Sequence, residues 1–274
     1  MVIDTHQHFW VYDPVRDNWI DDSMKTIRRD FLPKHLKPIL KINKVDGCIA
    51  VQADQSIEET KFLLNLAKEN SFIKGVVGWV DLTSKELEKQ LSSLSKNGHL
   101  KGVRHIVQAE KNDFVLREDF QKGIGKLKQF NLTYDLLIFP SQIPAAIQLI
   151  QKFPKQKFIL NHIAKPNIKK KEILEWKHQI QKMAKAPNIF CKVSGMVTEN
   201  NWKDWNIADF TPYLDVIFEA FGIDRIMYGS DWPVCLLAAD YKQQMQIIEN
   251  YISKFTEEEK EKILCNNAIS IYNL

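Results

Sequence analysis

Short runs of β-branched and other apolar residues recur along the chain, and longer segments with helical patterning separate them. Runs of this kind, bounded by polar and turn residues, are typical of strands. We predict eight strands, at 2–8, 47–53, 75–80, 102–107, 133–138, 158–162, 189–193 and 225–228. Parallel neighbours need crossover connections, so strands that alternate with helices indicate a parallel sheet.

The segments between these strands carry helix signals. Three have a hydroxyl residue followed three positions later by glutamate, as in a capping box: Ser56 with Glu59, Thr83 with Glu86, and Thr256 with Glu259. Another helix is predicted to have its cap at Thr211, before Pro212, and to end at Gly222. Apolar residues also recur three or four apart, as on a helix that packs one face on a sheet: Leu87, Leu91 and Leu94, then Ile143, Ile147 and Ile150.

Eight strand–helix units in 274 residues predict an α/β fold, a closed (β/α)8 TIM barrel that forms a single domain over residues 1–274. An open doubly wound sheet is the alternative. No Gly-x-Gly-x-x-Gly follows the first strand, which disfavours a dinucleotide-binding sheet. The segment 9–43 is predicted to be a long, aromatic-rich loop between the first strand and the first helix, and such loops are usually functional.

The composition, 45% hydrophobic and 26% charged, is that of a globular protein. No apolar run is long enough to span a membrane, and we expect no secretory signal at the N-terminus. Four widely spaced cysteines predict reduced thiols in the cytoplasm. The net charge of +4 is small, and the basic run 169–171 has no interleaved aromatic residues, so we expect a solvated face and no nucleic-acid partner.

Polar residues gather where the predicted strands end, which is where barrels carry their active sites. His6 and His8 lie two apart, so both imidazoles should face the barrel mouth, where they could bind a metal or donate to an oxyanion. Asp231, between a glycine turn and Pro233, is the strongest single candidate. His162 ends the sixth strand, just before Lys165, and is predicted to be an acid/base or an electrophile.

Other candidates have a functional and a structural interpretation. Arg104 suits a substrate carboxylate or a polarised carbonyl, or else a buried ion pair, whereas His105 should pack outward under a helix. Lys192, on one face with Ser194, is either a substrate-binding residue or part of an interstrand ion pair. The aromatic residues of the first loop either line a pocket or cover the barrel rim; they are Trp10, Tyr12 and Trp19. Cys48 and Cys191 lie within strands and are expected to be small core residues.

These motifs resemble the amidohydrolase superfamily, and most of all its amidohydrolase-2 type and lactonase-like branch, which contains sugar-lactone lactonases and pyrone-dicarboxylate lactonase. The resemblance runs in order over residues 2–235, through DTHQHFW, VQADQS, GWVDL, KGVRHIVQ, YDLLIF, LNHIAKP, CKVSGM and YGSDWPV. The segments NHIAKP and GSDWP make it specific. It implies that His6, His8, His162 and Asp231 form the catalytic set and adds Gln52, within VQADQS, to the substrate-binding candidates.

Metal-dependent members of the superfamily add a histidine on the fifth strand, and binuclear members add a bridging carboxylate or carbamylated lysine. This chain departs from that pattern, because 134–139 reads YDLLIF and Arg104 stands near the place of a bridging ligand. The resemblance therefore implies the lactonase branch, in which several members need no divalent ion. We predict that no cofactor is required, although His6, His8 and Asp231 could hold zinc weakly.

The leading hypothesis is a hydrolase of carbohydrate catabolism that opens a sugar-acid lactone of the L-rhamnono or L-fucono type. Asp231 would be the general base, and His6, His8, His162 and Arg104 would polarise the carbonyl. A zinc-dependent decarboxylase of aromatic or unsaturated acids is the alternative, followed by a barrel that only binds a ligand and by other C–O or C–N hydrolysis. The partner is then a small-molecule lactone. The sequence leaves open the particular sugar and the oligomeric state.

Overall fold

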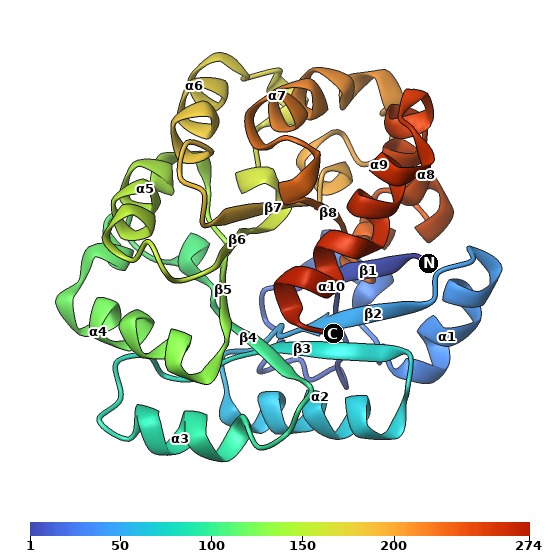
Figure 1. Cartoon of the computed structure of the whole chain (residues 1–274). Coiled ribbons are helices and arrows are strands. Elements are labelled where there is room, and N and C mark those ends of the chain that lie inside the picture. Colours follow the sequence, from blue (N-terminus) through green and yellow to red (C-terminus); the bar gives the residue numbers. More distant parts are fainter.

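The strand–helix alternation folds into a barrel in the computed structural model, which describes residues 1–274 (Figure 1). One parallel sheet runs in the order β1 to β8. Its strands are β1 Ile3–Gln7, β2 Gly47–Val51, β3 Ile73–Gly78, β4 Leu100–His105, β5 Thr133–Leu136, β6 Phe158–Leu160, β7 Ile189–Val193 and β8 Ile226–Tyr228. Gln7 pairs with Trp232, just after β8, and so brings the first and last strands together. The predicted barrel is confirmed.

Helices follow the strands, and most of them cover the outside of the barrel. They are α1 Pro33–Ile42, α2 Ile57–Glu69, α3 Leu87–Leu94, α4 Glu118–Leu127, α5 Ile143–Lys152, α6 Leu174–Met183, α7 Thr211–Phe221, α8 Tyr241–Tyr251, α9 Glu257–Glu261 and α10 Asn267–Tyr272. The helix α1 begins inside the predicted loop 9–43, at Pro33, so the aromatic-rich connection is shorter than the sequence suggested. No helix is long and apolar enough to cross a bilayer.

Two helix starts differ from the prediction. The Thr83 hydroxyl donates to Asp81 at 2.6 Å and caps nothing, so α3 begins only at Leu87. Thr211 is the first residue of α7 instead of its cap. The cap of α2 at Ser56, the capping box of α9 at Thr256 and the end of α7 at Gly222 are confirmed. Short polar side chains fix a helix start only when they have no better local partner.

The apolar residues form two separate clusters. The larger lies between the strands and the surrounding helices, and its members include Leu87, Leu91 and Ile143. The smaller fills the barrel interior and joins inward-facing strand residues to α10, as Ile49 and Tyr272 illustrate. Figure 1 shows α10 lying across the barrel. Since α10 plugs one end, only the end where the strands finish remains for a site.

Candidate active site

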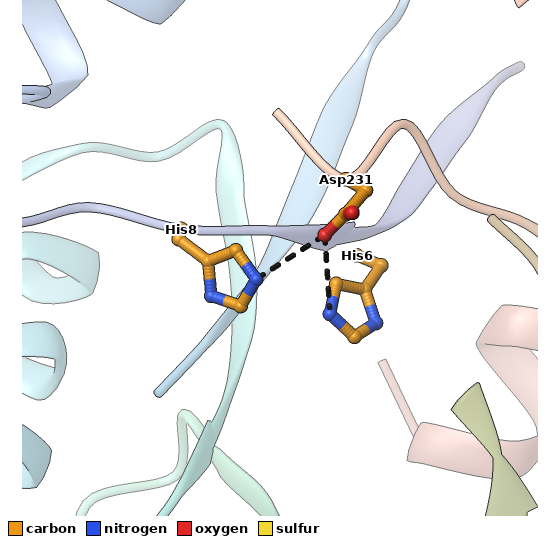
Figure 2. A group of neighbouring side chains, drawn as sticks. All are labelled: His6, His8 and Asp231. Carbon is orange, nitrogen blue, oxygen red and sulfur yellow. Dashed lines mark ion pairs between the residues drawn. The ribbon is translucent and has the colours of Figure 1, made fainter. Parts of the chain in front are cut away.

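Three histidine side chains converge on one carboxylate oxygen where the strands end. The Nε2 atoms of His6, His8 and His162 lie 3.8, 3.4 and 3.7 Å from Oδ1 of Asp231. Figure 2 shows the rings of His6 and His8 directed at the Asp231 carboxylate. None of the four side chains is more than 6% exposed. The fold thus brings together the four residues that the sequence singled out, in a setting from which bulk water is nearly excluded.

A bulge in β1 aims its two histidines. The pairing of β1 with β2 shifts between Asp4 and Gln7, so β1 carries an extra residue there. Ile3 packs inside the barrel, and the bulge lets His6, three residues later, face the same interior. His8 follows two positions further on. Bulges often redirect side chains next to active sites.

The other two residues of the set lie on turns with left-handed backbone. The strand β6 ends at Leu160, earlier than predicted, and His162 has φ 53° within the turn that follows. Asp231 has φ 59°. Gly195, after β7, approaches His162 so closely that a Cβ atom there would lie 2.4 Å from Nδ1. A side chain at this position would displace the imidazole, so the glycine is required by packing.

Asp4 is a positioning residue that the sequence reasoning missed. Its buried carboxylate accepts hydrogen bonds from Ser230 N and Oγ at 2.8 and 2.5 Å, from His6 N at 3.1 Å and from Tyr241 Oη at 3.0 Å. Burial raises its pKa to about 6 in spite of these donors. Asp4 therefore ties the strand that carries His6 to the turn that carries Asp231. The sequence feature that could have identified Asp4 is its position two residues before His6.

The tautomers of the two strand histidines follow from their partners. Nδ1 of His8 lies 2.7 Å from the Val51 carbonyl oxygen, which can only accept, so Nδ1 carries the proton. Nε2 of His6 lies 3.3 Å from Nη1 of Arg104, which can only donate. In the neutral rings both Nε2 atoms are therefore acceptors. This differs from the sequence-based interpretation, which made these rings hydrogen-bond donors to the substrate.

The charges of the set follow from burial. Burial lowers the pKa of His6 and His8 and, for His162, lowers it to about 3. Burial alone would raise the pKa of Asp231, but the positive charge of Lys165 and the charges that His162 and His8 take up at low pH hold that pKa below its usual 3.8. Near neutral pH the set consists of one carboxylate and three uncharged imidazoles. Such a carboxylate, with lone pairs around it, can accept a proton from water.

Arg104 lies beside this set without a carboxylate partner. Its guanidinium donates to Oε1 of Gln52 at 3.0 Å, to the Gln52 carbonyl oxygen and to Oδ1 of Asn161 at 3.3 Å. Its Nε atom is buried and has no partner. Burial lowers its pKa to about 10, so it stays charged. No ion pair forms, so of the two interpretations the geometry supports a cation that is held ready for a ligand. His105, on the same strand, packs outward against Phe114 as predicted.

Lys192 lies deeper in the barrel and has a carboxylate partner. Its Nζ atom contacts Oδ2 of Asp135 at 2.7 Å, and both side chains are completely buried. The same carboxylate oxygen accepts a hydrogen bond from the Asn161 amide at 2.9 Å. Oδ1 of Asn161 in turn accepts a hydrogen bond from the Arg104 guanidinium. The structure therefore supports the interstrand ion pair that the sequence left open for Lys192. Gln52 is also fully buried, and both polar atoms of its side-chain amide form hydrogen bonds with Arg104.

Trp10 and Trp19 of the first loop form one wall beside the histidines. Trp10 is buried, lies 6.4 Å from the His8 ring between centroids, and donates its indole N–H to the Arg29 carbonyl oxygen. Trp19 meets Trp10 edge to face at 6.1 Å and is 42% exposed. Tyr12 is half-buried and packs on the core. The wall thus runs from the histidines to the surface.

The donor atoms of His6, His8 and Asp231 suit a zinc ion in kind and position. One ligand atom from each lies within 4.8 Å of the others. Both imidazole Nε2 atoms present lone pairs there, and the Nδ1–H of His8 is fixed by the Val51 carbonyl, as a ligand histidine usually is. Arg104 competes for the His6 lone pair. The strand β5 supplies no histidine, and its Asp135 is already paired with Lys192.

Comparison with known proteins identifies the family of the chain. Residues 3–274 match the amidohydrolase family. An L-fucono-1,5-lactonase of Burkholderia multivorans is 34% identical over 99% of this chain and 96% of its own. An L-rhamnono-gamma-lactonase of Scheffersomyces stipitis is 26% identical over 66% of this chain and 61% of its own. The protein belongs to the amidohydrolase family.

Solved structures agree with this assignment. A crystal structure of an amidohydrolase from Burkholderia multivorans with bound zinc superposes with a TM-score of 0.97 at 33% identity, and it covers 100% of this chain and 99% of that one. A probable 2-pyrone-4,6-dicarboxylic acid hydrolase from Acinetobacter baumannii superposes with a TM-score of 0.79 at 18% identity, covering 100% and 99%. At that identity the likeness concerns the fold.

Proposed function

We propose that the protein hydrolyses a lactone, and specifically a sugar-acid lactone of the L-fucono or L-rhamnono type. The observation that carries the proposal is the convergence of three neutral imidazoles on the ionised, buried Asp231. The similarity to an L-fucono-1,5-lactonase over nearly the whole of both chains supports the reaction class. Four buried, free cysteines support the predicted cytoplasmic location.

Asp231 acts as the general base in this proposal. A water molecule donates one hydrogen bond to the carboxylate and the other to Nε2 of His8, 3.4 Å from it, since both atoms are acceptors. Its oxygen lone pair then faces the lactone carbonyl carbon. As the oxygen attacks, Asp231 takes the proton, a C–O bond forms and the carbonyl oxygen gains negative charge.

Arg104 and His162 stabilise that oxygen. The Arg104 guanidinium keeps its charge, and its Nε atom has no protein partner. We assign Ser194 Oγ, which lies 2.9 Å from Nδ1 of His162, as the donor of this hydrogen bond, so that Nε2 of His162 keeps its proton for the substrate. Collapse breaks the bond to the ring oxygen, and Asp231 returns its proton to that oxygen. The product is the open-chain hydroxy acid.

Zinc is not required for this chemistry, in our proposal. The residues that would hold it are His6, His8 and Asp231. A bound zinc ion would lower the pKa of water and polarise the carbonyl. Arg104 already supplies positive charge beside the same atoms, and a lactone is a more reactive carbonyl than an amide.

The remaining candidates have different parts. Trp10 and Trp19 form the wall against which the lactone ring binds, whereas Tyr12 packs on the core. Gln52 and Lys192 act indirectly: Gln52 bonds to Arg104, and Lys192 reaches it through Asp135 and Asn161. This reassigns both from direct substrate contact to support of Arg104.

The test is proton release over a panel of sugar lactones, with and without a chelator, beside an identically purified Asp231→Asn variant. Acid release by the wild type alone supports the proposal and excludes contaminating lactonase. Release of carbon dioxide from an aromatic or unsaturated carboxylate, dependent on zinc, would instead support the decarboxylase alternative. Turnover of no lactone at all would contradict the proposed function.

A further inference from the structure

A second pair of charges lies where the barrel opens to solvent. Nζ of Lys165 and Oε1 of Glu199 are 2.5 Å apart, and their side chains are 17% and 18% exposed. Lys165 follows β6 and Glu199 follows β7, so both extend from the end of the barrel that holds the catalytic set. Exposure therefore rises from Asp231, which is 4% exposed, through this pair to the surface.

The backbone holds Lys165 in a fixed relation to the catalytic His162. Residues 162–165 all have positive φ, between 48° and 61°, and none of them is glycine. Left-handed backbone is unfavourable for residues other than glycine, so surrounding contacts must impose it. The Lys165 N–H donates to the His162 carbonyl oxygen at 2.7 Å, and the Trp176 indole donates to the Ile163 carbonyl oxygen at 2.9 Å. A strained turn of this kind serves to place its side chains.

Lys165 carries its positive charge three residues after His162, on the same left-handed turn. Glu199 next to it cancels most of that charge at longer range. An anionic ligand group near the ammonium would also meet the glutamate, so the pair as a whole does not favour a carboxylate.

The pair offers both kinds of hydrogen-bond partner. A lysine ammonium has three N–H donors, of which Glu199 takes one, and the glutamate keeps free acceptor positions. Two neighbouring hydroxyl groups match this arrangement, because one can accept from nitrogen while the other donates to oxygen. Phe139, which follows β5, is 39% exposed and has its ring centroid 5.9 Å from Lys165 Nζ. It adds a flat apolar surface for the C–H face of a sugar ring.

We propose that Lys165 and Glu199 recognise adjacent hydroxyl groups of the substrate ring, and so restrict the enzyme to uncharged polyhydroxylated lactones. This inference rests on the proposed lactonase function and goes beyond it, because it names residues that determine specificity. Loss of a polar partner in such a site penalises the matching substrate far more than one without hydroxyl groups.

The experiment compares two substrates in four proteins. The substrates are a neutral sugar δ-lactone and δ-valerolactone, which has the ring but no hydroxyl groups. The proteins are wild type, Lys165→Met, Glu199→Gln and the control Lys122→Met. Lys122 forms an exposed pair with Glu118 on α4, at 2.8 Å, and lies outside the site. The control removes the same charge where such pairs contribute little.

We expect the ratio of kcat/KM for the sugar lactone to that for δ-valerolactone to fall about tenfold to a hundredfold in each site variant, mainly through KM, since a charge-assisted hydrogen bond is lost. The control should keep the wild-type ratio. If δ-valerolactone turns over too slowly, its inhibition constant against the sugar lactone replaces its kcat/KM.

An unchanged ratio in both site variants, with the two substrates affected equally, would overturn the inference and leave the proposed function standing. Higher kcat/KM for a carboxylate-bearing lactone than for the neutral one in the wild type would also overturn it. A wild type that opens no lactone would contradict the proposed function itself, which is a separate result.

Discussion

Two buried polar clusters lie one above the other inside the barrel, and they are satisfied in opposite ways. In the lower cluster, Lys192 meets Asp135 at 2.7 Å with both side chains fully buried, and Asn161 adds a further donor. In the upper cluster, the ionised Asp231 faces Nε2 acceptors of His6 and His8, with no proton between them. Matched partners make the lower cluster structural, whereas the upper cluster still needs a donor or a cation.

The lower cluster should be the more sensitive to loss of a partner. Lys192→Met leaves the Asp135 carboxylate buried without its cation, which costs about 3–5 kcal/mol of unfolding free energy. Denaturant melts should show the loss. The double variant Lys192→Met/Asp135→Asn, which removes both charges, should be more stable than the single one. A double variant as unstable as the single would show that the charges are not what matters here.

The upper cluster should lose activity while the protein stays folded. Asp231→Asn keeps the size of the side chain and removes its ability to accept a proton, so kcat should fall by on the order of a hundredfold or more. Steady-state proton release measures this, and circular dichroism checks the fold. Near-normal turnover in the folded variant would remove Asp231 from the mechanism. The upper cluster would then no longer differ from the lower one in being catalytic.

Arg104 connects the two clusters and should show an intermediate effect. Arg104→Lys keeps the charge but cannot contact Gln52, Asn161 and substrate together, so kcat/KM should fall by about 1–3 kcal/mol. The melting temperature is the second readout. A lower melting temperature with unchanged kcat/KM would assign Arg104 to the structural cluster instead.

Sequence patterns predicted the barrel and gathered His6, His8, His162 and Asp231, because strand periodicity and strand ends are local properties. They could not predict which buried charges would be matched. That Lys192 faces Asp135 depends on the register of β7 against β5 through β6, a long-range property.

Two further features of the site could not be predicted from the sequence. The left-handed turn at His162 is imposed by tertiary contacts such as Trp176, and its residues have no glycine to signal it. The donor or acceptor role of His8 depends on the Val51 carbonyl, which only the pairing of β1 with β2 brings near.

The pH dependence of the activity tests the charge state of the upper cluster, and the expected effect is smaller than that of the substitutions. Burial would raise the pKa of Asp231, but His162 and its other neighbours hold it below 3.8, so the base stays ionised as pH falls. The acidic limb of kcat/KM should therefore lie below about pH 4, close to the ordinary aspartate value or lower. Activity measured from pH 5 to 8 should show no acidic limb from Asp231. A limb centred near pH 6 would instead point to Asp4, whose pKa burial raises to about 6, and would contradict Asp231 as the group whose protonation stops the reaction.

Chelation should have the smallest effect. The acceptors around Asp231 can be satisfied in two ways, by zinc or by a water molecule that donates two hydrogen bonds. Zinc at His6 must displace the Arg104 N–H, at 3.3 Å from the same Nε2 atom, and place its charge beside the guanidinium. Water needs no such displacement, and in our mechanism it is the nucleophile. We therefore expect most of the lactonase rate to remain in protein that elemental analysis shows to be free of zinc. Activity that disappears with the metal and returns in proportion to about one zinc per chain would make His6 and His8 essential ligands, and the upper cluster would then be completed by a cation.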